Sequence, residues 1–114
     1  MLPDHKELSL GVETLSGTSI VRCHGRLTIT SASMLRDEVK RLLPHTRDIV
    51  IDLTDLIMMD SVGLGTIAAL YASARNAGCE LHMVNLAPRI RELFSLARLL
   101  SLFEPCGTAN IRIP

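Results

Sequence analysis

Residues 52–65 read Asp-Leu-Thr-Asp-Leu-Ile-Met-Met-Asp-Ser-Val-Gly-Leu-Gly, and the fold is organised around this stretch. The preceding run Ile-Val-Ile at 49–51 is typical of a strand covered on both faces, as in a parallel sheet. The polar residues that follow predict a short acidic turn. Apolar residues then recur at helical spacing, at Leu64, Ile67, Leu70, Tyr71 and Ala74. The chain is therefore expected to change from strand to helix at Asp60-Ser61, a junction where open α/β sheets place their sites.

One face of this predicted helix carries no charge. Opposite the core stripe it has only small or uncharged residues, namely Val62, Gly65, Thr66, Ala69, Ala72, Ser73 and Asn76. A solvated helix face normally carries Lys and Glu, so this face indicates a second packed surface or a docking site. Ser61 projects toward it, and a modification of its hydroxyl would affect whatever docks there. The simpler interpretation is that Asp60 and Ser61 only cap the helix.

The chain before this stretch predicts a hairpin and a helix. Alternating residues at 8–13 indicate a half-buried strand, and a Ser16-Gly17 turn leads into a second strand at 18–24. A helix capped by Thr30 or Ser31 and stopped by Pro44 follows, with a possible Asp37–Arg41 pair. Its apolar stripe consists of Ala32, Leu35, Val39, Leu42 and Leu43.

The chain after this stretch continues the alternation. Gly78 is suited to end the helix, and residues 80–86 return as a strand. Pro88 suits the first turn of a last helix at 89–100, and Ile111 with Ile113 can form a short edge strand. Together these elements predict one α/β domain over residues 1–114, with a mixed, mostly parallel sheet, an N-terminal hairpin and packed helices.

Composition excludes several classes of function. With 47% hydrophobic and 3% aromatic residues and a formal net charge of zero, the chain lacks the basic excess and the stacking aromatics of a nucleic-acid binder. The three cysteines are widely spaced and indicate neither a disulfide framework nor a zinc site, which fits a reducing cytoplasm. No signal peptide or membrane span is expected. No P-loop or dinucleotide fingerprint indicates a cofactor.

The sequence carries parts of two enzymatic sites but completes neither. Asp52, Asp55 and Asp60 could hold Mg²⁺ or accept phosphate, but the rest of such a site is missing, so they are interpreted as turn and cap residues. A hydrolase elbow needs Gly two residues before the serine, where this chain has Met59. Its base would be a distant histidine, and His82 is interpreted as a structural residue within a strand. The chain is therefore predicted not to be an enzyme.

The hexapeptide from Asp60 to Gly65, Asp-Ser-Val-Gly-Leu-Gly, resembles the D-S-x-G-L-G motif of bacterial anti-sigma factor antagonists, which are single-domain STAS proteins. Gly25-Arg26-Leu27, the strand at 80–86 and the helix at 89–100 fall in that family's order. In the family, the serine after the Asp accepts phosphate, and that position here is Ser61. The family commonly has an acidic residue where this chain has Thr28.

The resemblance implies a switch protein without a cofactor or metal. Unphosphorylated, it would bind a serine/threonine-kinase anti-sigma factor of histidine-kinase-like ATPase fold and so free a sigma factor, until phosphorylation at Ser61 ends the binding. A serine phosphatase would restore the active form. The expected contact residues are Thr28, Met58, Met59, Asp60, Ser61, Val62, Gly63, Gly65, Thr66, Ala69 and Ala72, although one of the two methionines is expected to fill the core. The alternative is a constitutive STAS scaffold or transport-complex subunit in which Ser61 only caps the helix.

Overall fold

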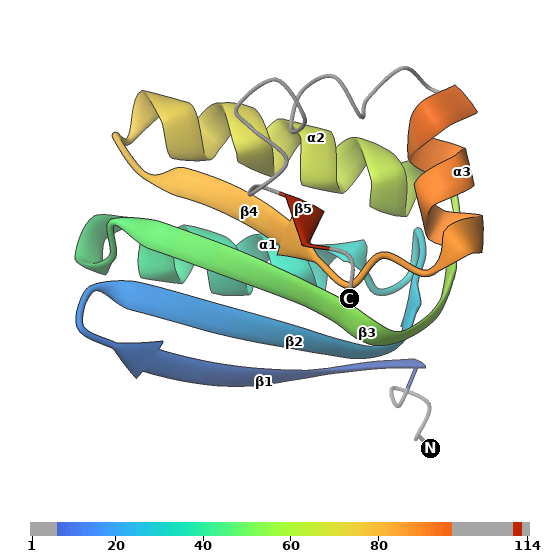
Figure 1. Cartoon of the computed structure of the whole chain (residues 1–114), viewed down its shortest axis with the longest axis horizontal. Coiled ribbons are helices and arrows are strands. Elements are labelled where there is room, and N and C mark those ends of the chain that lie inside the picture. The colour runs from blue at the N-terminus through green and yellow to red at the C-terminus, as the bar shows by residue number, and fades with distance from the viewer. Residues whose placement is uncertain (1–6, 97–110, 113–114) are drawn as a thin grey trace.

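The computed structural model describes residues 7–96 and 111–112, which form one sheet with helices packed on it (Figure 1). Apolar stripes and turn residues place the elements close to where the sequence predicts them. In chain order they are β1 (Leu8–Leu15), β2 (Thr18–Leu27), α1 (Ala32–Leu42), the 3-10 turn η2 (Leu43–His45), β3 (Asp48–Met59), α2 (Ser61–Asn76), β4 (Glu80–Val84), α3 (Pro88–Leu96) and β5 (Ile111–Arg112).

The five strands lie side by side in the order in which they occur in the chain. β1 and β2 are antiparallel, whereas β2, β3, β4 and β5 run parallel to their neighbours. The mixed, mostly parallel sheet with an N-terminal hairpin is thus confirmed. Ser16 and Gly17 make the hairpin turn with φ of 54° and 84°, a left-handed conformation that glycine adopts without steric cost.

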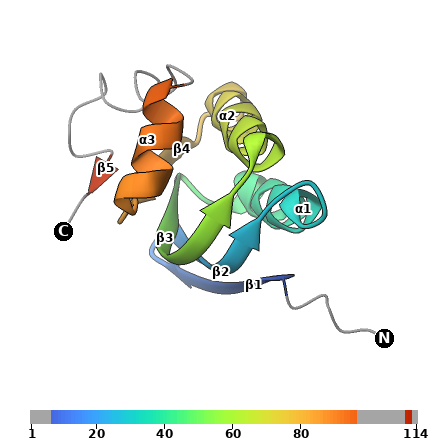
Figure 2. The ribbon, with the colours of Figure 1, turned by 90° about the vertical axis from the view of Figure 1, so that its right-hand side faces the viewer.

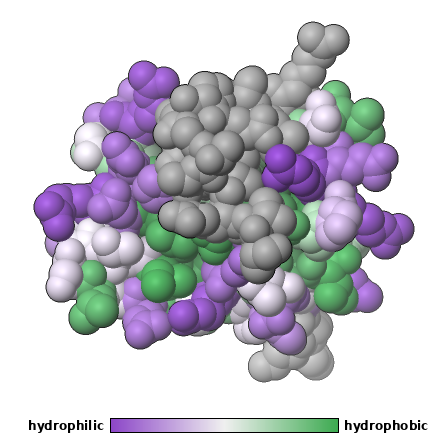
Figure 3. All heavy atoms as spheres, in the orientation of Figure 1, coloured by the Kyte–Doolittle hydropathy of each residue, from purple (hydrophilic) through white to green (hydrophobic). Residues whose placement is uncertain are grey.

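Helices α1 and α2 lie side by side on one face of the sheet, as Figure 2 shows along the strands. Side chains from this face and from the helices form a continuous aliphatic core that includes Val21, Ile51, Leu35 and Ile67. Removing such side chains from water is the main source of stability of the fold. The opposite face carries mixed polar and apolar residues, interspersed where Figure 3 shows it uncovered.

β3 is longer than the sequence predicts. The expected acidic turn does not exist, because the strand continues through Asp52 and Asp55 to Met59. Two register shifts between β2 and β3, at Arg22/His24 and at Gly25/Arg26, mark bulges that interrupt the alternation of inward and outward residues. The Asp52 carboxylate accepts hydrogen bonds from the Thr54 amide and hydroxyl at 3.0 and 2.6 Å. Asp52 and Asp55 are therefore strand residues, not turn residues.

Local details of the helices depart from prediction at several points. Ser31 occupies the N-cap position of α1, but its side chain makes no capping hydrogen bond. Arg41 pairs with Glu38 instead of Asp37, whose carboxylate lies 3.6 Å from Arg36 Nε. β4 ends at Val84, two residues early. Residues 97–100 of the expected last helix lie outside the described residues, as does Ile113, while Ile111 does form an edge strand.

β1 leaves the core along its length. Leu8 is buried, but Val12 is 40% exposed and Leu15 is 73% exposed. The half-buried strand expected at 8–13 is thus correct only at its start, because β1 is the outer strand of the sheet and the helices cover mainly its neighbours. The candidate site lies at the other end of the sheet from the hairpin turn, where β2 ends at Leu27 and β3 ends at Met59.

Candidate functional site

Asp60 joins strand β3 to helix α2. It is the N-cap of the helix, and its Oδ1 accepts the Gly63 amide at 2.9 Å. Its Oδ2 accepts the amide of Ile29, in the loop after β2, at 3.0 Å. The pKa of Asp60 lies below its usual value because these amides, Gly63 first, hydrogen-bond its charged form. One carboxylate therefore caps the helix and fastens it to the neighbouring loop.

Ser61 is the first residue of α2, and it is exposed. Within the part of the chain that the structure describes, its hydroxyl makes no hydrogen bond, because the capping function is performed by Asp60. Backbone amides at a helix start carry partial positive charge. The arrangement thus presents a serine hydroxyl to solvent at a position that favours negative charge.

The loop after β2 is held by a cluster of polar side chains. The Glu7 carboxylate accepts hydrogen bonds from the hydroxyls of Thr28 and Thr30, and the Thr28 hydroxyl in particular lowers the pKa of Glu7. The Ser31 hydroxyl accepts the Thr28 amide at 2.9 Å and donates to the Arg26 carbonyl at 2.8 Å. These bonds leave Ile29 69% exposed beside the start of α2.

The uncharged face of α2 is open to solvent. Val62, Gly65, Ala69 and Ala72 are exposed, and the half-buried Thr66 donates its hydroxyl to the Val62 carbonyl at 2.8 Å. A hollow of about 380 Å³ runs along this face, and Arg36 and Lys40 of α1 form its other side. Two cations therefore border a surface whose own residues are uncharged, which helical spacing within α2 alone does not reveal.

Three of the expected contact residues are buried. Met59 is 5% exposed and Thr28 is 7% exposed. Of the two methionines, Met58 faces solvent, with 44% of its surface exposed. A Cβ on Gly63 would lie 2.3 Å from the Leu27 carbonyl oxygen, so this glycine is where α2 packs directly on β2. The expected set is corrected accordingly: these three residues lie beneath the surface and do not form part of it.

The described residues do not assemble the Mg²⁺ site or the hydrolase site of which the sequence carries parts. Asp52 is bound to Thr54 and to Asn85 Nδ2 at 3.0 Å, and Asp55 lies 3.9 Å from His24 Nδ1, whereas Asp60 binds amides at the helix start. Among the described residues the three carboxylates are not grouped for a metal ion. His82 lies on β4, which starts at the opposite end of the sheet from Ser61, so this histidine does not activate that hydroxyl.

Comparison with known proteins identifies the family of this chain. The family model of the STAS domain matches residues 9–111. The anti-sigma-B factor antagonist of Bacillus subtilis (strain 168) is 30% identical over 84 residues, which cover 74% of this chain and 77% of that protein. The chain therefore belongs to the STAS-domain anti-sigma factor antagonist family, whose members are regulators and not enzymes.

Solved structures agree in fold. An anti-sigma factor antagonist from Mycobacterium paratuberculosis superposes with a TM-score of 0.79 at 23% identity, covering 97% of this chain and 90% of that one. The phosphorylated form of the Bacillus cell fate determinant SpoIIAA gives a TM-score of 0.68 at 18% identity, covering 82% and 87%. Among the described helices of this chain, none is long and apolar enough to cross a membrane.

Proposed function

We propose that this protein is a phosphorylation-controlled partner switch in the cytoplasm. Unphosphorylated, it binds a serine/threonine-kinase anti-sigma factor of histidine-kinase-like ATPase fold, and a sigma factor is released. The docking surface, as we define it, consists of Met58, Asp60, Ser61, Val62, Gly65, Thr66, Ala69 and Ala72. Phosphorylation of Ser61 ends the binding, and a serine phosphatase reverses it. The observation that carries the proposal is the exposed Ser61 hydroxyl, which has no hydrogen-bond partner among the described residues and begins the uncharged helix face.

The physical basis is that the start of helix α2 tolerates a negative charge better than an apolar partner surface does. A phosphoserine carries about −1.5 to −2 charges, and the N-terminus of α2 favours such a charge by roughly 0.3–1 kcal/mol. An apolar partner surface pressed against Val62 and Ala69 offers no comparable compensation. Burying an unpaired anion there costs several kcal/mol, and every ~1.4 kcal/mol is a tenfold loss of affinity.

The family supports this direction. A relative 30% identical to the chain is named an anti-sigma-B factor antagonist, and SpoIIAA, which shares the fold, has been solved in a phosphorylated form. These names describe those proteins, and the corresponding binding and modification are what we propose here for Ser61.

The alternative, a constitutive scaffold or transport-complex subunit, assigns Ser61 only a capping role. The capping hydrogen bond in this structure is made by the Asp60 side chain to the Gly63 amide. The serine hydroxyl is therefore not needed to begin the helix, which favours the switch over the scaffold.

The test is to incubate the chain with a candidate serine/threonine-kinase anti-sigma factor and ATP. We expect one phosphate, located at Ser61 by peptide mapping and absent in Ser61→Ala. Calorimetric titration should show that Ser61→Asp binds that partner at least about tenfold more weakly, while its melting temperature is unchanged. Ser95→Asp is the matched control, because Ser95 is an exposed serine on α3. Equal binding by wild type and Ser61→Asp would show that charge exclusion is wrong.

A further inference from the structure

Three potential metal ligands meet at the amino ends of two neighbouring parallel strands. Asp48 begins β3, and Glu80, its partner in the sheet register, begins β4. His82 lies two residues further along β4 and projects to the same side as Glu80. Because Ser61 follows the carboxyl end of β3, the three residues lie at the opposite end of the sheet from Ser61 (Figure 1).

The donor atoms are close enough to share one ion. His82 Nε2 lies 3.6 Å from Asp48 Oδ1 and 3.6 Å from Glu80 Oε1, and all three donors lie within 4.8 Å of one another. Zinc bonds of 2.0–2.2 Å in a tetrahedral site place neighbouring donors about 3.3–3.6 Å apart. The distances from His82 Nε2 to the two carboxylate oxygens already match this spacing. The two carboxylates need only a small approach, which the 75% exposed side chain of Glu80 can make by rotation.

The charges at this place favour a cation. Within the described residues, neither Asp48 nor Glu80 forms an ion pair with an Arg or Lys. Arg47, which precedes Asp48 in the sequence, directs its guanidinium to the Ser16 carbonyl, at 3.3 Å, by the hairpin turn. Arg75 of α2 lines a hollow that Glu80 and His82 also line, but among the described residues it forms no ion pair with Glu80. Two carboxylates therefore face a single imidazole.

The backbone beneath the donors is fixed. The Glu80 amide donates to the Arg47 carbonyl at 2.9 Å, and the Arg47 amide donates to the Gly17 carbonyl at 2.8 Å. Ligands that stand on adjacent strands lose little conformational freedom when an ion binds, because the sheet already holds their Cα atoms in place.

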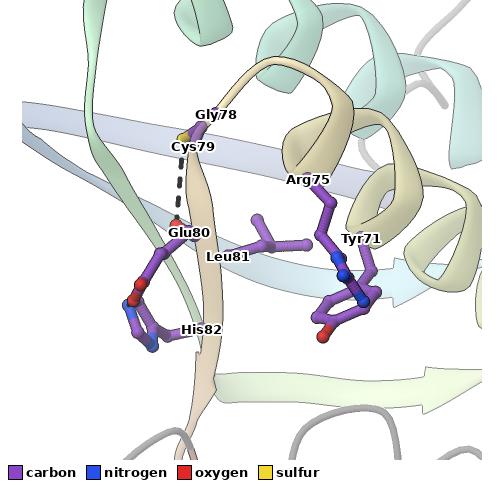
Figure 4. A pocket seen from close by; sticks show the side chains of 7 residues that line it. All are labelled: Tyr71, Arg75, Gly78, Cys79, Glu80, Leu81 and His82. Atoms are coloured by element: carbon purple, nitrogen blue, oxygen red, sulfur yellow. Dashed lines mark hydrogen bonds and ion pairs between the residues drawn. The ribbon is translucent and has the colours of Figure 1, made fainter. Parts of the chain in front are cut away.

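A second, separate feature is an opening beside the donors. A hollow of about 510 Å³ is lined by Glu80 and His82 together with Tyr71 and Arg75 of α2. Figure 4 shows the Glu80 carboxylate against the His82 ring on one side of β4, and the two α2 side chains on the other side. The 75% exposed side chain of Glu80 leaves an ion held by the three donors open to solvent, so that a water can be a further ligand.

We propose that Asp48, Glu80 and His82 form a binding site for a divalent transition metal, with Zn²⁺ the preferred ion. An imidazole with two carboxylates suits zinc better than Mg²⁺ or Ca²⁺, which prefer oxygen ligands alone. The ion would bridge the first residues of β3 and β4. This site is independent of the Ser61 switch, so each can fail without the other.

The test is calorimetric titration of the full chain with Zn²⁺. A second titration with Co²⁺, in buffer without added thiols, is followed by absorbance. We expect one ion per chain in the micromolar range, and a rise in melting temperature on binding. Asp48→Asn and Glu80→Gln should each weaken binding at least about tenfold, and His82→Ala should abolish it. The Co²⁺ spectrum should show nitrogen and oxygen ligation without the charge-transfer band of a bound cysteine.

The matched control is His24→Ala. His24 also lies on a strand and near a carboxylate, with Nδ1 3.9 Å from Asp55 Oδ2, but it has only that one acidic neighbour. This variant should bind Zn²⁺ as the wild type does. In amide NMR spectra, Zn²⁺ should shift residues 47–49 and 79–83 and leave 60–66 unchanged. Absence of binding at millimolar Zn²⁺, unchanged binding by both carboxylate variants, or loss of binding in His24→Ala would overturn the proposal.

Discussion

Two glycines of α2 that are two residues apart should respond in opposite ways to the same substitution. A Cβ at Gly63 would lie 2.3 Å from the Leu27 carbonyl oxygen and 3.0 Å from Cγ of both Leu27 and Met59. Carbon–oxygen contacts are normally no shorter than about 3.3 Å, so Gly63→Ala requires a separation of about 1 Å between α2 and β2. Gly65, by contrast, has no atom within 4 Å of the position that its Cβ would take.

The separation of α2 from β2 carries a cost that can be estimated. It would strain the bonds that join them, from the Asp60 amide to the Leu27 carbonyl at 3.2 Å and from the Ile29 amide to Asp60 Oδ2 at 3.0 Å. Overpacking costs roughly 1–3 kcal/mol, and each of the two weakened hydrogen bonds adds about 1 kcal/mol. After the better helix propensity of Ala is subtracted, Gly63→Ala should lower the free energy of unfolding by about 2–4 kcal/mol.

Urea unfolding and thermal melting measure this difference. For a domain of this size, about 1 kcal/mol corresponds to roughly 4 °C, so Gly63→Ala should melt about 8–16 °C below the wild type. Gly65→Ala should be as stable as the wild type or more stable by up to about 1 kcal/mol. If Gly63→Ala melts with the wild type, or if both variants lose stability equally, the direct packing of Gly63 on Leu27 is wrong.

Two further predictions concern the docking surface and the cap. Ala69→Glu and Ala72→Glu should change the free energy of unfolding by less than about 1 kcal/mol, because both positions are exposed, but should weaken partner binding several-fold; a lower melting temperature with binding intact would contradict this assignment of the surface. Because amide hydrogen bonds lower the pKa of Asp60 in the folded chain, its contribution to stability is present above the unfolded value of about 3.9 and is lost as the pH falls through the folded value. Urea titrations from about pH 7 to about pH 3 should therefore find Asp60→Asn less stable at neutral pH and the gap to wild type narrowing in acid, and a gap independent of pH would refute the role of the charge.

The strand–helix junction was predictable from sequence because its three signals are local. A β-branched run, an N-cap aspartate and a helical apolar stripe follow one another between 49 and 74. The structure places the end of β3 and the start of α2 on either side of Asp60, as expected. Exposure of Val62, Gly65, Ala69 and Ala72 also follows from helical spacing alone.

The course of β3 was not predictable in the same way. Its acidic residues resemble a turn, but they stand on the uncovered face of the sheet, where a polar side chain is tolerated within a strand. The two bulges against β2 then break the alternation by which a strand is recognised. A pattern of period two cannot show an irregularity that depends on the partner strand.

The polar cluster around Thr28 was missed for a related reason. Glu7 meets Thr28 and Thr30 only because β1 folds back along β2, which places Leu8 opposite Gly25. Nothing near Glu7 in the sequence indicates this contact. The metal site is similar, since Asp48 and Glu80 are neighbours only through the β3–β4 register. Contacts between strands can be predicted only after the topology of the sheet is known.

The order of the strands in the sheet also bears on how the chain is made. Because each strand pairs with the one before it, no strand must wait for a segment that the ribosome has yet to add. β2 can accept β3 once Met59 has emerged, and the Leu27 carbonyl against which Gly63 packs is then already in place. The strand pair on which Gly63 packs is therefore formed wholly by residues that precede α2 in the chain.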